Sequence, residues 1–220
     1  MFLSGAAAAA FAASGAPLYA QTTNRLDPGG LTFRDFGTPD NGSSYTRGEQ
    51  SIGGGTTQSF TRVLGIDAAS QAVRLRFDSV KIELLLPMGW QASEDEERGV
   101  AYTIDKRIRL IVWRVDFTFE GVKDAEHYAA TKAGSMKARR RGVEAQARKL
   151  RDGSFLIVYE NLPKGPSDSG GPRTVFDLVI PSPRNPKVGV LVTLGMPTSE
   201  AGRGLQLLAL ITQNMRIDWQ

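Results

Sequence analysis

An alternating apolar stretch runs from Val73 to Leu86 and stops abruptly at Pro87. Apolar residues at every second position are typical of strands that bury one face. A break at Asp78-Ser79 divides the stretch in two, and a proline removes a donor from the hydrogen-bond ladder of a sheet. We therefore expect two consecutive strands that end at Pro87. Their inward positions are Val73, Leu75, Phe77, Val80, Ile82, Leu84 and Leu86.

The rest of the chain changes between strand and helix periods. Asp124 suits a helix N-cap, apolar residues follow it at helical spacing, and Gly142 is placed to end that helix. A second helix is expected after Thr198 or Ser199. This order predicts an α+β domain with a mostly antiparallel sheet and helices packed on it. Further strands are expected at 100–104, 108–119, 143–150, 155–160, 175–180 and 188–194, and an Asp152-Gly153 turn should join two of them.

The strand expected at 108–119 is apolar on both of its faces. Leu110, Ile111, Val112 and Trp113 are four consecutive apolar residues. A continuous apolar run is expected where both faces of a strand are covered. We therefore predict that both faces of this strand are covered.

The first twenty residues have the character of an export signal. Residues 1–20 hold no charged side chain, are rich in alanine, and end in a Pro-Leu-Tyr-Ala sequence that suits cleavage before Gln21. We expect an exported chain, periplasmic or secreted, with no transmembrane anchor after cleavage. The alternative is a disordered or weakly anchored N-terminus.

The next fifty residues predict a flexible tether in front of the folded domain. Residues 21–70 are rich in Gly, Ser, Thr and Asn, and their apolar residues show no sustained period. Such a segment buries too little surface to offset its ordering entropy. Weak strand potential is present at Leu31–Phe36 and at Phe60–Leu64. The folded domain is then expected to cover residues 71–220.

The composition removes several kinds of chemistry. The chain contains no cysteine and one histidine, His127, which excludes disulfides, thiolate metal sites and mechanisms that need two histidines. The acidic run Glu94–Glu97 offers oxygen ligands for Ca²⁺, but consecutive carboxylates without loop spacing are more typical of a solvated turn. We therefore expect neither a metal site nor a cofactor.

Positive charge is concentrated in one part of the chain. Between Lys123 and Arg151 there are nine basic and three acidic side chains. Such a basic surface would attract an acidic protein or an anionic component of the envelope. The same residues are also compatible with a solvated helix end. Nucleic acid is not expected as a partner, because aromatic residues do not alternate with the basic ones. The candidate binding residues are Lys137, Arg139, Arg140, Arg141, Arg148 and Lys149.

One short motif resembles a protease signature. Ser167-Asp168-Ser169-Gly170-Gly171-Pro172 is similar to the sequence around the nucleophile of trypsin-like proteases. In those enzymes a histidine oriented by an aspartate activates the serine. The available histidine, His127, lies on an expected helix, so we interpret the motif as a surface loop. No catalytic residues are predicted, and the chain is not expected to be an enzyme.

The sequence resembles the PsbP-like domain family. The resemblance covers about residues 72–219 and rests on a strand entering Pro-x-Gly-Trp, a long strand, a helix near Asp-Ala-Glu-His-Tyr, an Asp-Gly hairpin and a final helix ending at Asn214-Met215. Photosynthetic extrinsic proteins, a yeast Ran-binding import factor and small bacterial envelope proteins share this fold. The resemblance implies a binding or assembly domain without catalytic residues. It also implies that Trp90 folds back onto the sheet edge, whereas an exposed, ligand-stacking Trp90 is the alternative.

The sequence therefore predicts an exported, non-catalytic binding or assembly domain that interacts with another envelope component. Two alternatives are kept. The first is a carrier that holds a small apolar ligand between sheet and helix. The second is a serine hydrolase built around Ser169.

Overall fold

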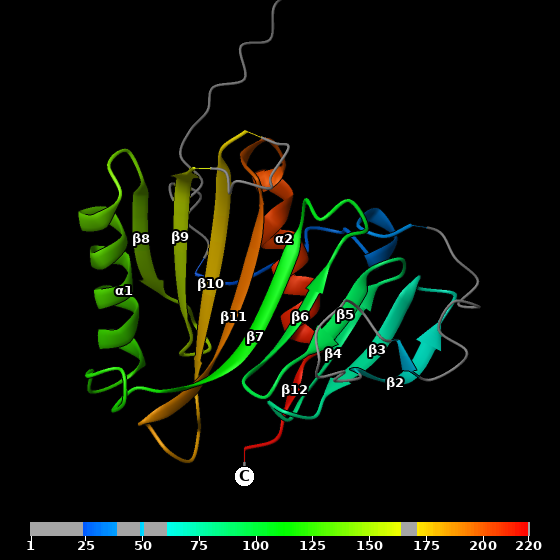
Figure 1. Ribbon diagram of the computed structural model, residues 1–220, viewed down its shortest axis with the longest axis horizontal. Coiled ribbons are helices and arrows are strands. Elements are labelled where there is room, and N and C mark those ends of the chain that lie inside the picture. Colours follow the sequence, from blue (N-terminus) through cyan, green and yellow to red (C-terminus); the bar gives the residue numbers. More distant parts are fainter. Residues whose placement is uncertain (1–23, 39–48, 51–60, 164–170, 220) are drawn as a thin grey trace, which may run out of the picture.

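A computed structural model describes residues 24–38, 61–163 and 171–219, together with the backbone of residues 49 and 50. The expected signal peptide and Ser169 both lie outside these ranges. Within the described ranges the chain forms two antiparallel sheets and two α-helices (Figure 1). The predicted α+β class with antiparallel pairing is confirmed. The predicted single sheet is replaced by two.

The larger sheet has seven strands in the order β5-β6-β7-β11-β10-β9-β8. Six of these strands were expected from the sequence within a few residues, and β5 was missed. The long pairings of β11 with β7 and β10 form its centre. The strands are β5 (Gln91–Glu94), β6 (Arg98–Tyr102), β7 (Arg109–Asp116), β8 (Glu144–Lys149), β9 (Phe155–Leu162), β10 (Arg173–Pro181) and β11 (Val188–Pro197).

The smaller sheet has five strands in the order β1-β2-β3-β4-β12. Its centre is the predicted pair of strands, and the expected alternation is confirmed because Val73, Leu75 and Phe77 are buried while Arg74 and Arg76 point outward. The strands are β1 (Glu49–Gln50), β2 (Thr61–Asp67), β3 (Ala72–Phe77), β4 (Ile82–Pro87) and β12 (Arg216–Ile217).

The two helices lie on opposite faces of the seven-stranded sheet. Helix α1 (Ala125–Arg139) packs mainly on β8, β9 and β10, and helix α2 (Ala201–Gln213) packs between β10, β11 and β4 (Figure 1). Two hydrophobic cores result, one beneath α1 and a larger one that joins α2 to both sheets. Short 3-10 helices, η2 (Phe33–Asp35) and η4 (Thr198–Glu200), complete the fold.

Helix α1 begins where the sequence predicted. The Asp124 carboxylate accepts a hydrogen bond from the His127 backbone N–H at 2.8 Å, which satisfies one free donor of the first turn. The helix ends at Arg139, and Gly142 follows with a φ of 83° that favours glycine. Its last turn holds Lys137 and Arg139, where the helix dipole favours cations.

Trp90 closes the core, as the sequence resemblance implied. Pro87 ends β4 and Gly89 turns the chain with a φ of 82°, so that the indole of Trp90 is buried. Its Nε1–H donates to the carbonyl of Phe36 at 2.9 Å. The corner also moves the chain from the smaller sheet into β5 of the larger one.

Part of the expected tether belongs to the folded domain. Residues 24–38 lie against α2 and the Trp90 corner, with Phe33 buried and Arg203 donating to the carbonyl of Asp35 at 2.6 Å. Strand β2 pairs with β3, so the weak strand potential at Phe60–Leu64 was correct, whereas Leu31–Phe36 forms a 3-10 turn. Within the 21–70 range, residues 21–23, 39–48 and 51–60 lie outside the described part of the chain.

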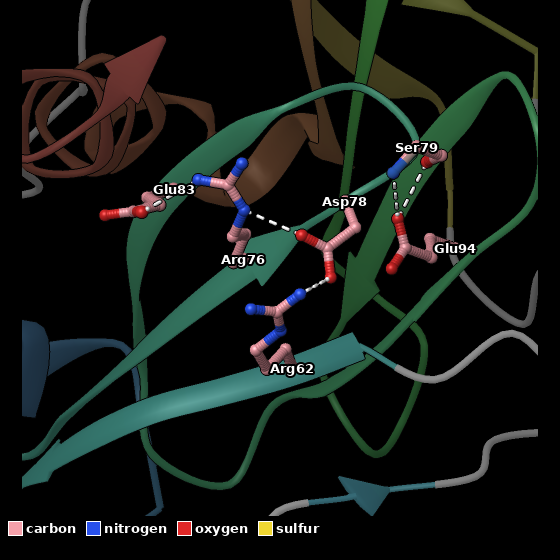
Figure 2. A network of polar contacts seen from close by, with 6 residues as sticks. All are labelled: Arg62, Arg76, Asp78, Ser79, Glu83 and Glu94. Atoms are coloured by element: carbon pink, nitrogen blue, oxygen red, sulfur yellow. Dashed lines mark hydrogen bonds and ion pairs between the residues drawn. The ribbon is translucent and has the colours of Figure 1, made fainter. Parts of the chain in front are cut away.

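A polar network joins the sheets at the turn between β3 and β4 (Figure 2). On the outer face of the smaller sheet Asp78 binds Arg62 at 2.5 Å and Arg76 at 2.7 Å. Burial acts against ionisation of Asp78, but these two arginines hold the pKa of its carboxyl below the usual value. Beside it Glu94 of β5 accepts from the N–H and hydroxyl of Ser79 at 2.9 and 2.7 Å. Glu94 is therefore a buried link between the sheets, and the prediction of a solvated acidic turn is wrong for this residue.

Candidate binding surface

Helix α1 leaves part of the sheet face on its own side uncovered. It packs mainly on β8 to β10, so the same face of β6 and β7 extends beyond the helix. On this side β6 presents Arg98, Val100 and Tyr102, and β7 presents Arg109, Ile111, Trp113 and the buried Val115. We call Val100, Tyr102, Arg109, Ile111 and Trp113 the open face. Four of them are half-buried and Arg109 is exposed.

Strand pairing places the open-face residues in two rows. Val100 lies opposite Ile111, and Tyr102 lies opposite Arg109. Across the sheet, Ile111 continues to Thr193 of β11 and then to Asp177 of β10. Side chains directly opposite each other on one face are close enough to form a continuous surface. The open face is therefore a connected apolar strip next to α1.

The structure corrects the prediction that both faces of β7 are covered. Leu110 and Val112 are fully buried in the core beneath α2, as expected. Ile111 and Trp113, on the other face, are only half-buried. The apolar run does form a strand, as predicted, but it does not show where α1 crosses the sheet.

A buried ion pair forms the edge of the open face beneath α1. Lys132 Nζ lies 2.8 Å from Asp177 Oδ2, and the hydroxyl of Thr193 donates to Asp177 Oδ1 at 2.5 Å. Asp177 is 2% exposed. Burial alone would lower the pKa of Lys132, but the Asp177 carboxylate outweighs it and raises that pKa above the usual value. The ammonium therefore stays charged next to the open face.

Aromatic rings surround this ion pair. Lys132 Nζ lies 5.7 Å from the ring centre of Trp113 and 5.5 Å from that of Tyr128, which are cation–π distances. Burial, and then the nearby Asp177, raise the pKa of Tyr159. The Tyr159 hydroxyl and Trp113 Nε1 make no hydrogen bond of normal geometry to the described residues. The cluster thus holds a charged pair among aromatic rings.

A cleft of about 590 Å³ opens beside the cluster. Trp113, Tyr128 and Lys132 form one wall, and the rest of the lining includes Glu96 and Glu97 and the neighbouring part of β7. A second cleft, of about 540 Å³, lies at the Trp90 corner and is bordered by an ion pair between Arg107 and Glu200 at 2.5 Å. Both clefts carry charged walls, and neither lies between the sheet and the middle of α2, where Leu207, Leu208 and Ile211 fill the space. This arrangement does not favour a carrier of small apolar ligands.

The six predicted basic residues do not form one surface. Arg139, Arg140 and Arg141 are exposed together at the C-terminal end of α1. Arg148 and Lys149 lie at the far end of β8, which runs back along the helix. They point to opposite faces of the sheet, because Arg148 pairs with Leu156 of the α2-side core and Lys149 with Phe155 of the α1-side core. Lys137 lies 3.9 Å from Glu144.

His127 is engaged at the start of α1. Its Nδ1 accepts a hydrogen bond from the Lys123 backbone N–H at 3.4 Å, and its backbone N–H donates to the Asp124 carboxylate. Ser169, the other residue of the protease-like motif considered above, lies outside the described residues.

The open face itself was missed at the sequence level. The apolar run Leu110–Trp113 was one indication of it, but the residues of a strand do not show which strands a helix will cover. Lys132 and Asp177 were also missed, since a lysine in a helix and an aspartate in a strand show no spacing that links them.

The fold is that of an α+β domain with a helix on each face of its larger antiparallel sheet. Neither a family model nor a curated protein matches the sequence. Solved structures with a similar fold include the Ran-binding protein Mog1p of Saccharomyces cerevisiae, which is 13% identical over 66% of this chain and 95% of its own, with a TM-score of 0.48. A mutant of Mog1 is 12% identical over 66% and 95%, with a TM-score of 0.46.

The cyanobacterial PsbP of Synechocystis is 16% identical over 77% of this chain and 98% of its own, with a TM-score of 0.46. These are PsbP-like and Mog1-like folds, as the sequence resemblance implied. Similarities of this size concern the fold and carry nothing about a partner. Among the described residues, neither helix has the length and apolar character needed to cross a bilayer.

Proposed function

We propose that this chain is an exported, non-catalytic binding domain that holds another protein of the envelope on its open face. The observation that carries the proposal is the strip of half-buried apolar side chains on β6 and β7 that helix α1 does not cover. Contiguous apolar surface rimmed by polar residues is typical of a protein-interaction site. Trp and Tyr in this strip are residue types enriched at the centres of such sites.

Charge at the rim favours an acidic partner segment. Arg109 projects from the strip and Lys106 lies 6.0 Å from the ring centre of Tyr102, whereas the charge of Lys132 is balanced by Asp177. A segment that carries apolar side chains and carboxylates would match both the strip and these cations. The best-placed titratable pair, Lys132 and Asp177, is already engaged internally, which favours binding over acid–base chemistry.

The test is a crosslinking pull-down from envelope extract with the chain starting at Gln21. The decisive variant is Ile111→Asp, because it places a charge in the middle of the strip without emptying either core. The matched control is Leu85→Asp, a half-buried position on the outer face of the smaller sheet. Circular dichroism and thermal melting verify that both variants are folded.

We expect one partner to be captured by the parent and by Leu85→Asp and to be lost with Ile111→Asp. A partner that Ile111→Asp still captures would place binding elsewhere. The combined variant Arg139→Glu, Arg140→Glu, Arg141→Glu then tests the arginine cluster, which the sequence offered as an interface. If the parent captures no protein under any of these conditions, the binding function is wrong.

A further inference from the structure

The outer edge of β8 has the features of a self-pairing edge. Within the described ranges β8 pairs with β9 alone, and it is the last strand of the seven-stranded sheet. Such an edge presents a row of backbone donors and acceptors to any further strand. The opposite end of this sheet differs, since β5 lies close to β1 and β2 of the smaller sheet.

The side chains of β8 alternate between the two faces of the sheet. Ala145 pairs with Tyr159, which belongs to the core beneath α1. On the other face Glu144, Gln146 and Arg148 follow one another at every second position. This row carries an acid at its start, a neutral amide in its middle and a base at its end.

A second copy of β8 matches this row when it runs antiparallel. In an antiparallel pair, residues directly opposite each other lie on the same face of the sheet. If the two-fold axis passes through Gln146, Glu144 lies opposite Arg148 of the second copy, and the same contact occurs twice. On the α1 side Ala145 then lies opposite Ala147, and both side chains are small. Moving the axis by one residue, to Ala147, brings no opposite charges together.

Helix α1 is self-complementary about the same axis. Lys137 reaches Glu144 round the outer edge of β8, at 3.9 Å, so the side of the helix that carries Lys137 is turned toward this edge. That side carries Glu126, Ala130, Gly134 and Lys137 at spacings of three and four residues, so it has an acid at one end, a base at the other and small residues between. A side chain at Gly134 would meet no atom within 4 Å, so there is room for a second helix.

The centres of the two elements coincide. From Glu144 to Gln146 the strand advances by about 7 Å. This distance corresponds to between four and five residues of the antiparallel helix, counted back from Lys137, and the axis therefore passes near residues 132–133 of α1. Glu126 of one helix then comes near Lys137 and Arg139 of the other. The same two-fold axis therefore brings unlike charges together on β8 and on α1, although the charged residues of the two elements occupy separate positions in the sequence.

We propose that the protein forms a two-fold dimer in which the β8 edges of two copies pair antiparallel, with the axis through Gln146. The dimer joins two seven-stranded sheets into one and places the two α1 helices side by side. The open face lies over β6 and β7, away from this edge, and stays accessible in both copies. The dimer is thus independent of the binding function proposed above.

A charge exchange tests the dimer and its register. Sedimentation velocity, with the chain from Gln21, measures the dissociation constant of the parent and of the single variants Glu144→Arg and Arg148→Glu. Each single variant places like charges opposite each other twice, and we expect each to weaken the dimer about tenfold or more. An equimolar mixture of the two variants restores the unlike pairs, so a heterodimer should form at the affinity of the parent. The double variant should also restore the dimer.

A measurement on the unaltered chain covers the case in which a variant does not fold. Hydrogen exchange of the β8 amides should slow as the protein concentration rises, while the exchange of β5 amides should not change. A parent chain that sediments as a monomer at all concentrations would overturn the proposal. A dimer that both single variants leave intact, or single variants that do not recover on mixing, would also overturn it.

Discussion

Among contacts between single residues, the ion pair of Lys132 and Asp177 is the one whose loss should destabilise the fold most. Asp177 is nearly inaccessible and would be left as an uncompensated charge beneath α1 if the lysine were lost. We predict that Lys132→Met lowers the free energy of unfolding by about 3 kcal/mol. The double variant Lys132→Met, Asp177→Leu should recover most of this loss, because it removes both charges. Urea denaturation at pH 7 measures both; a double variant less stable than the single one would contradict this account.

The same pair predicts a pH dependence at alkaline pH. The folded-state pKa of Lys132 lies above its ordinary value of 10.5, so the ion pair adds stability that is complete below that pH. This stability is lost as the pH rises from 10.5 through the folded-state pKa. The difference in unfolding free energy between the parent and Lys132→Met should therefore be constant at neutral pH and shrink above pH 10.5. Denaturation titrations of both proteins between pH 7 and 11 follow this difference.

At Gly99 the addition of a single methyl group should destabilise the fold. A Cβ at this residue would lie 2.3 Å from Cγ of the buried ring of Phe77. We predict that Gly99→Ala costs about 1–3 kcal/mol, because the ring is enclosed between the two sheets and cannot move away. Gly202→Ala in the first turn of α2 is the matched control, since its Cβ would meet no atom within 4 Å. Thermal melts of the two variants should differ clearly; equal melting temperatures would show that Phe77 is free to shift.

At the level of elements, residues 24–38 decide whether the domain begins near residue 71 or earlier. Phe33 is 6% exposed, and the segment is held by Arg203 and by Trp90 Nε1. We predict that Phe33→Ala lowers the unfolding free energy by about 3 kcal/mol, whereas Arg25→Ala on the exposed part of the same segment has little effect. Guanidinium denaturation separates the two. Equal stabilities would mean that the segment behaves as a tether.

The elements were predictable wherever their own residues determine them. The alternation at Val73–Phe77, the Asp124 cap and the turn before Trp90 are local patterns, and each is present as expected. Strand β2 gave only a weak signal, because its register shifts between Val63 and Gly65 and interrupts the alternation. The division into two sheets was not predictable, since local period does not state which strand pairs with which.

For the whole molecule, the basic residues that the sequence suggested as one binding surface are separated by the fold. Counting charges drew attention to the stretch from Lys123 to Arg151, whereas the fold separates those residues onto two ends and two faces. The open face depends on where α1 crosses the sheet. Lys132 and Asp177, which border it, come from elements that are far apart in the chain. Long-range arrangements of this kind have no short-range signature.

Export is a further property of the whole chain that stays a prediction. The uncharged, alanine-rich start predicts cleavage before Gln21. Expression of the full chain in its own host should give an envelope-fraction protein whose N-terminal residue is Gln21. Intact-mass spectrometry of that fraction measures it. A full-length protein that remains in the cytoplasmic fraction would contradict export, although it would leave the binding surface untouched.

The most direct test of the open face is site-specific photocrosslinking in intact cells. A photoreactive residue is placed at Val100 on the open face, at Arg140 in the arginine cluster, or at Arg74 on the outer face of the smaller sheet. We predict one discrete protein adduct from position 100 and none from positions 140 and 74. An adduct from position 140 or 74, with none from position 100, would contradict the open face as the binding site.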